Sequence, residues 1–114
     1  MAWQALISQA GERIAGHVRR TPVTGLDLGG RAVALKLEQM QHTGSFKARG
    51  AFNTLLQAEV PEAGIVAASG GNHGAAVAHA AAALGYRARI YVPEIAGPAK
   101  IALIRAQGAD LTVV

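Results

Sequence analysis

The sequence predicts an α/β protein in which helices cover a parallel sheet, in three layers of helix, sheet and helix (α/β/α). Two observations lead to this class. Strand-like and helical segments alternate along the second half of the chain with short connections, which is typical of parallel strands joined by crossover helices. Glycine and alanine are abundant, as expected where helices pack closely on a sheet.

The first half of the chain predicts two helices with a strand between them. A first helix, ending near Arg19-Arg20, carries one apolar stripe formed by Trp3, Leu6, Ile7, Ala10, Ile14 and Val18. Residues 32–37 alternate loosely, as a strand does. A second helix is expected from Phe46 to about Ala58, with Ser45 as its N-cap and with an inward face formed by Phe52, Leu55 and Leu56.

The second half predicts three strands and two helices in alternation. They are strand 65–68, helix 73–84, strand 88–93, helix 98–107 and strand 111–114. A glycine follows each helix, and a proline opens the second one, as is common at helix ends. The loop from Pro61 to Gly64 predicts a boundary between two lobes, residues 1–60 and residues 61–114.

The composition argues against several classes of function. The chain has no cysteine, which excludes a disulfide framework and thiol chemistry. Its net charge of +4 is modest, its basic residues are scattered and only 4% of its residues are aromatic, which argues against a nucleic-acid partner. His73 and His79 fall on different faces of their helix, so no metal site is expected. No signal-peptide pattern and no apolar run of roughly 18 residues is present. The composition therefore predicts a cytoplasmic protein without a membrane partner.

Lys47 is the most informative residue of the chain, in the run TGSFKARG from Thr43 to Gly50. A Gly-Ser turn after the first strand brings this amine to the first turn of the following helix. An amine in such a position is a candidate Schiff-base former. An ordinary first-turn lysine on a solvated helix face fits the octapeptide equally well, so this run alone leaves both interpretations open.

A second motif, SGGNHG from Ser69 to Gly74, follows strand 65–68 and opens an alanine-rich helix. Its glycines let the backbone approach a ligand closely, and the helix start offers unpaired N–H groups that suit a carboxylate or phosphate. Asn72 adds an amide that can hydrogen-bond a phenolic oxygen, and Ser69 adds a hydroxyl. This motif favours a ligand-binding loop.

The same strand, loop and helix support two other hypotheses. In a nicotinamide-dinucleotide-binding unit, Ser69, Gly71 and Gly74 would match the glycines of G-x-G-x-x-G, and Glu94 would bind the ribose about 20 residues further on. This alternative places a serine where the tight turn needs glycine, and it leaves the lysine turn unexplained. The other alternative is a truncated α/β module that binds a partner chain and catalyses nothing.

The two motifs together resemble those of pyridoxal-phosphate enzymes of the tryptophan-synthase-β fold type, and most of all the threonine and serine dehydratases and serine racemases. Arg20 to Val23 and Leu35 to Gln41 also resemble the lead-in of this family. The resemblance covers essentially the whole chain but only the N-terminal portion of such an enzyme. It implies an incomplete fold-type-II enzyme, with residues 1–60 in the large cofactor-binding lobe and residues 61–114 in the small lobe that carries the substrate-carboxylate loop.

The resemblance also implies a cofactor and a role for each motif residue. Pyridoxal 5'-phosphate would be held by Lys47, the catalytic residue, which would also remove the α-hydrogen of the substrate. Phe46 and Asn72 would contact the cofactor. The carboxylate of an amino-acid substrate would be bound by Ser69, Gly70, Gly71, Asn72 and His73.

The implied reaction is β-elimination of L-threonine or L-serine to a 2-oxo acid and ammonia, in an enzyme that forms a homo-oligomer at full length. The segment alone is expected to be inactive, because the phosphate loop of such enzymes lies further along. Serine racemase of the same family is the alternative. Its members have a serine at the position that matches Gly70, and glycine has no proton to give to the opposite face of the substrate. The resemblance therefore favours the dehydratase.

Overall fold

The computed structural model describes residues 2–114. The first half of the chain contains α1 (Ala2–Ile14), β1 (Val23–Asp27), β2 (Ala32–Lys36), two short 3-10 turns η1 (Glu38–Met40) and η2 (His42–Gly44), and α2 (Lys47–Leu55). The second half contains β3 (Ile65–Ala68), α3 (Asn72–Ala83), β4 (Ala88–Val92), a 3-10 turn η3 (Glu94–Ala96), α4 (Pro98–Ala106) and β5 (Asp110–Val113).

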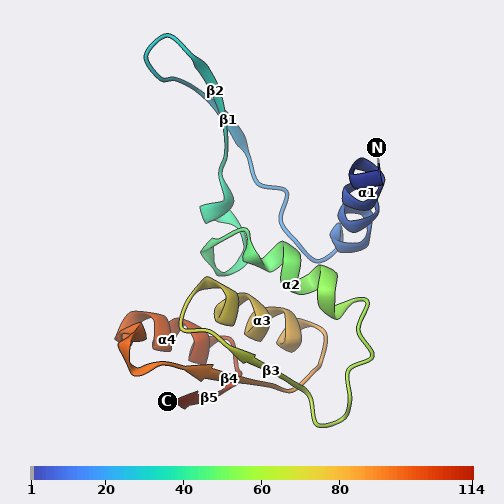
Figure 1. Cartoon of the computed structure of the whole chain (residues 1–114), viewed down its shortest axis with the longest axis vertical. Helices are drawn as coiled ribbons and strands as arrows, with labels where there is room; N and C mark the ends of the chain where they lie inside the picture. Colours follow the sequence, from blue (N-terminus) through green and yellow to red (C-terminus); the bar gives the residue numbers. More distant parts are fainter. Residues whose placement is uncertain (1) are drawn as a thin grey trace.

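The parallel sheet is formed by the second half of the chain, as the sequence predicts. Its strand order is β3-β4-β5, with Ile65 beside Ala88 and Arg89 beside Asp110 in the register. Figure 1 shows α3 and α4 on the same side of this sheet, with α2 lying over α3. The α/β class is confirmed. Of the three predicted layers, residues 2–114 contain the sheet and the helices on one of its faces.

The core lies between this sheet and α2, with α3 in the middle. The buried residues of α3 face in all directions, because this helix has α2 on one side and the sheet on the other. Phe52 and Leu55 of α2 are buried in the same cluster as Ile90 and Val92 of β4, and Leu56 is half-buried. The core therefore crosses the 60/61 boundary without a break, and the division into lobes stays a prediction about a longer protein.

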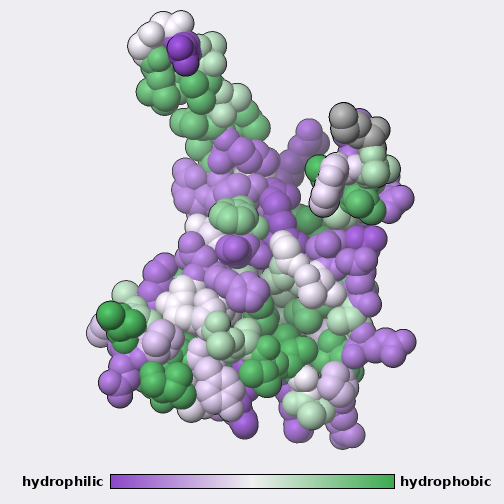
Figure 2. Space-filling view, viewed as in Figure 1, coloured by the Kyte–Doolittle hydropathy of each residue, from purple (hydrophilic) through white to green (hydrophobic). Residues whose placement is uncertain are grey.

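The predicted strand 32–37 is confirmed as β2, but its partner β1 was not predicted from the sequence. The two strands pair antiparallel, with Val23 opposite Lys36. Gly29 and Gly30 close the hairpin with φ angles of 61° and 83°, the conformation that a two-residue turn of this kind needs. Figure 1 shows the hairpin projecting away from the core, and Figure 2 shows that its surface is largely hydrophobic.

The predicted first helix is shorter than expected. α1 ends at Ile14, four residues before Val18, just before Gly16, a residue type that disfavours helix. Of the predicted apolar stripe, Ile14 is buried, whereas Trp3 and Ile7 remain exposed. α1 is tied to α2 by a hydrogen bond of 2.6 Å from Arg13 Nη1 to Asn53 Oδ1.

We predict that alanine substitutions at Gly11 and Gly74 change stability in opposite directions. A Cβ at Gly11 in α1 would meet nothing within 4 Å, so Gly11→Ala is expected to raise the free energy of unfolding by about 0.5–1 kcal/mol. A Cβ at Gly74 would lie 2.4 Å from the Ser69 carbonyl oxygen, so Gly74→Ala is expected to lower it by about 1–3 kcal/mol. Urea denaturation measures both changes, and shifts of the same sign would contradict this packing.

Candidate active site

A groove of about 550 Å³ lies where the start of α2, the strand β3 and the start of α3 meet. Its walls are mainly apolar and come from all three elements, with Phe46 and Lys47 from the start of α2, Val66 from β3 and His73 from α3. A groove of this size suits a small ligand. The structure therefore brings the lysine motif and the glycine motif, which are far apart in the sequence, to one place.

Lys47 is the first residue of α2. Phe46 occupies the N-cap position, so the prediction that Ser45 is the N-cap is wrong by one residue. The buried Ser45 still serves the helix start, because its hydroxyl accepts a hydrogen bond of 3.3 Å from the backbone N–H of Lys47. The Lys47 amine lies 5.2 Å from the centre of the Phe46 ring.

The three lysines of the chain differ in what their amines contact. Lys36 Nζ donates to the Thr21 carbonyl, and Lys100 Nζ donates to Asn72 Oδ1 at 3.1 Å. For Lys47 Nζ, the described part of the chain offers the Phe46 ring but no hydrogen-bond acceptor. Lys47 is therefore the lysine whose amine is available to a ligand in the groove.

The turn that precedes α2 is held by polar contacts with residues outside the groove. Arg49 forms an ion pair of 2.7 Å with Glu38. Burial raises the pKa of Glu38, but the hydrogen bond and charge of Arg49, with hydrogen bonds from Thr21 and Gln41, outweigh it and leave the pKa below its usual value. The carboxylate therefore stays charged and keeps its contact with the first turn of α2.

Gln41 provides a second contact for the same turn. Its buried side chain accepts a hydrogen bond of 2.9 Å from the Arg19 N–H and donates one of 2.8 Å to the Arg19 carbonyl. Thr43 and Gly44 follow with φ angles of 60° and 77°, a conformation that is costly for threonine. Such a turn persists only where its surroundings hold it, as Gln41 and Glu38 do here.

The glycine loop, Ser69 to Gly71, joins β3 to α3, which begins at Asn72, one residue earlier than predicted. A Cβ at Gly70 would lie 2.6 Å from Ala96 Cβ and 3.1 Å from Pro93 Cδ. The first intrahelical hydrogen bond of α3 runs from the Ala75 N–H to the Gly71 carbonyl. Within residues 2–114 the N–H groups of Asn72, His73 and Gly74 have no backbone acceptor, so they are free for an anionic ligand.

The predicted substrate-binding residues do not all line the groove. His73 does, whereas Ser69, Gly70 and Gly71 form the loop next to it and Asn72 is the first residue of α3. The side-chain oxygen of Asn72, Oδ1, already accepts a hydrogen bond from the amine of Lys100. The sequence did not connect Lys100 with the site. A lysine in the first turn of a helix, where a positive charge is unfavourable, was the signal in the sequence that could have drawn attention to it.

His42 and His79 also meet near the lysine turn, which the sequence did not predict. Their rings stack with centres 4.6 Å apart, and His79 Nδ1 lies 3.0 Å from Gln107 Oε1. Burial lowers the pKa of His42, and the charges of His79 and Arg19 lower it further. This pair joins η2 to α3 and does not line the groove.

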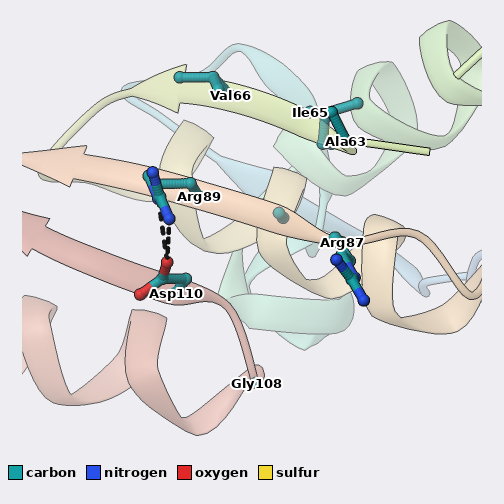
Figure 3. A pocket seen from close by; sticks show the side chains of 8 residues that line it. Ala63, Ile65, Val66, Arg87, Arg89, Gly108 and Asp110 are labelled. Carbon is teal, nitrogen blue, oxygen red and sulfur yellow. Dashed lines mark hydrogen bonds and ion pairs between the residues drawn. The ribbon is translucent and has the colours of Figure 1, made fainter. Parts of the chain in front are cut away.

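A second pocket, of about 370 Å³, lies on the open face of the sheet and is lined by Val66, Arg87, Arg89 and Asp110, among others. Figure 3 shows Arg89 and Asp110 pointing toward each other across adjacent strands, and their ion pair measures 2.8 Å. None of the predicted catalytic or loop residues belongs to this pocket. Across residues 2–114, no cluster of three or more potential metal-binding side chains forms, and no helix is long and apolar enough to cross a membrane.

The chain is similar in sequence to an L-threonine dehydratase of Staphylococcus aureus. The two are 44% identical over 112 residues, which are 92% of this chain and 32% of the relative. Among solved structures, it is similar to a T.th. threonine deaminase, with a TM-score of 0.83, 42% identity and coverage of 94% of this chain and 35% of that one. It is also similar in fold to maize serine racemase, with a TM-score of 0.88, 36% identity and coverage of 94% and 34%.

The chain therefore spans about a third of the length of the relatives it matches. Its resemblance to the fold-type-II enzymes is confirmed over that part. Residues 14–114 match the family described as pyridoxal-phosphate dependent enzyme, and this match favours the predicted family over the nicotinamide-dinucleotide alternative. A match over most of the chain, together with relatives that carry the same fold, shows that this chain belongs to the pyridoxal-phosphate-dependent enzyme family.

Proposed function

We propose that the chain carries the lysine side of the active site of a pyridoxal-phosphate-dependent ammonia-lyase that acts on L-threonine or L-serine. The observation that carries the proposal is the groove in which the Lys47 amine, without a hydrogen-bond acceptor in residues 2–114, lies near the start of α3. The sequence similarity to an L-threonine dehydratase supports the choice of reaction.

The residues of the groove fit pyridoxal phosphate. Its volume of about 550 Å³ is in the range of small-molecule sites, its walls are apolar, and it contains an accessible amine. The Phe46 ring, 60% exposed, lies beside that amine, where it can pack against a flat aromatic ligand. When bound, pyridoxal phosphate supplies an electron-withdrawing ring that makes the α-hydrogen of an amino acid acidic.

Each motif residue has a physical role in this proposal. Lys47 would hold the cofactor through its amine, and the same amine would take the proton from the α-carbon once the substrate has replaced it. The free N–H groups at the start of α3, next to His73, would bind the substrate carboxylate with Ser69, Gly70 and Gly71. The Asn72 Nδ2 group would donate to the phenolic oxygen of the cofactor. These roles involve charge-assisted hydrogen bonds, which are the stronger kind.

We predict that Lys47 is the lysine that pyridoxal phosphate modifies. The chain is incubated with the cofactor, reduced with borohydride and mapped by peptide mass spectrometry. Reduction is expected to fix the label on Lys47, because the amines of Lys36 and Lys100 already donate to protein oxygens. Lys47→Ala is expected to abolish the label, and Lys36→Ala, the matched control, to retain it.

A label on Lys36 or Lys100 in the unmodified chain would contradict the assignment of Lys47. Complete absence of a label would favour the non-catalytic module. The choice of reaction is tested separately, by measuring 2-oxo acid formation from L-threonine and L-serine with a polypeptide of the relatives' length that carries this segment. Formation of product that depends on Lys47 would support the ammonia-lyase.

Gly70 distinguishes elimination from racemisation in this proposal, since serine racemases of the family have a serine there. A Cβ at Gly70 would lie 2.6 Å from Ala96 Cβ, so a serine cannot enter this loop without a shift of its neighbour. We therefore predict that Gly70→Ser alone distorts the loop and lowers total turnover. The double variant Gly70→Ser/Ala96→Gly removes the nearest clashing atom and leaves Pro93 Cδ, at 3.1 Å, to shift by a few tenths of an ångström. This variant is expected to increase the ratio of D-serine to pyruvate formed from L-serine.

Chiral chromatography of the recovered serine measures this ratio, and Ala96→Gly alone is the control. An unchanged ratio in the double variant, with turnover restored, would show that the residue at position 70 does not determine which reaction follows proton removal. A high ratio in the unsubstituted enzyme would favour the racemase instead.

A further inference from the structure

The amide of Asn72 is held by a residue from a different part of the chain. Lys100, in the first turn of α4, donates a hydrogen bond of 3.1 Å from its amine to Asn72 Oδ1. The same region of the chain contacts the glycine loop a second time, since Ala96 and Pro93 lie against Gly70. The segment from β4 to the start of α4 therefore contacts both the glycine loop and the first residue of α3.

Helix stability does not explain a lysine at position 100. Pro98 is the first residue of α4, so the ammonium lies near the positive end of the helix dipole, which is unfavourable for a cation. Within residues 2–114 the ion pairs involve Arg49 and Arg89, and Lys100 has no carboxylate partner. What Lys100 does contact is the side chain of Asn72.

The chemistry of the two groups fixes the orientation of the amide. A lysine ammonium can only donate hydrogen bonds, so the side of Asn72 that faces it must be the carbonyl oxygen. The Nδ2 group then points away from Lys100, and residues 2–114 provide no hydrogen-bond acceptor for it. The charge on Lys100 also polarises the amide and makes those N–H groups stronger donors.

We propose that Lys100 is a positioning residue that orients the Asn72 amide so that Nδ2 donates to the cofactor. This inference rests on the proposed function for the direction of that donation, but the orientation of the amide is a property of the chain alone. Lys100 itself makes no contact with substrate or cofactor in this proposal. Arginine can replace it, because a guanidinium also only donates, whereas glutamine cannot, because it presents either an oxygen or a nitrogen.

The first test needs no cofactor. The Asn72 side-chain NH₂ signals are assigned by NMR in the ¹⁵N-labelled chain and compared in Lys100→Met, Lys100→Gln and Lys100→Arg. The methionine and glutamine variants are expected to shift these two signals, and the arginine variant to restore them. Lys36→Met, which removes a lysine outside the site, is the control and is expected to leave them in place. Unchanged Asn72 signals in Lys100→Met, with the remaining spectrum intact, would overturn the proposal.

The second test titrates pyridoxal 5'-phosphate and follows its absorption spectrum. Lys100→Met is expected to increase the apparent dissociation constant about tenfold, the effect of weakening one hydrogen bond to a charged group. Lys100→Arg is expected to stay within about twofold. If the unsubstituted chain binds no cofactor, the proposed function fails while the NMR result still decides the role of Lys100. If it binds and Lys100→Met binds equally well, the positioning role is wrong.

Discussion

The close packing of α2 on α3 is the contact on which the candidate site depends. The buried residues of α3 include Gly74, Ala75 and Ala78, so α2 and the sheet approach its backbone from two sides. Lys47 is the first residue of α2 and Asn72 is the first residue of α3, so the spacing of these helices also sets the spacing of the two motifs. A larger side chain on this face of α3 would separate the amine from the glycine loop.

Packing sets the distance between the motifs, and polar contacts hold the turn that precedes Lys47. The ion pair between Glu38 and Arg49 and the clamp of Gln41 on the Arg19 backbone hold the turn in which Thr43 adopts a left-handed conformation. A strained threonine costs about 1–3 kcal/mol, which these contacts and the core must offset. The backbone that carries Lys47 is therefore held before any ligand binds, so binding need not order this turn.

The sequence predicted the parts of this molecule that depend on local pattern. The alternating segments of the second half indicated the parallel sheet, because short apolar strands alternate with longer helical segments that end at Gly85 and Gly108. β1 was missed although Gly29-Gly30 between two strand-like runs is a hairpin signal, since Gly25 and the exposed strand faces weaken the pattern. Among the site residues, the motif predicted Lys47 and Asn72, but no local pattern could place Lys100 against Asn72, which is 28 positions away.

The segment between β4 and α4 carries no recognisable motif, yet it limits what the glycine loop can do. A Cβ at Gly70 would lie 2.6 Å from Ala96 Cβ, and Lys100 donates a hydrogen bond to Asn72 Oδ1, so both residues limit the loop and the start of α3. Under the proposed function, a serine at position 70 would therefore require a change at Ala96 in the supporting segment as well as in the loop. The fold is shared with a serine racemase, so under the proposed function the difference between elimination and racemisation lies in the residue at position 70 and in the contacts around it.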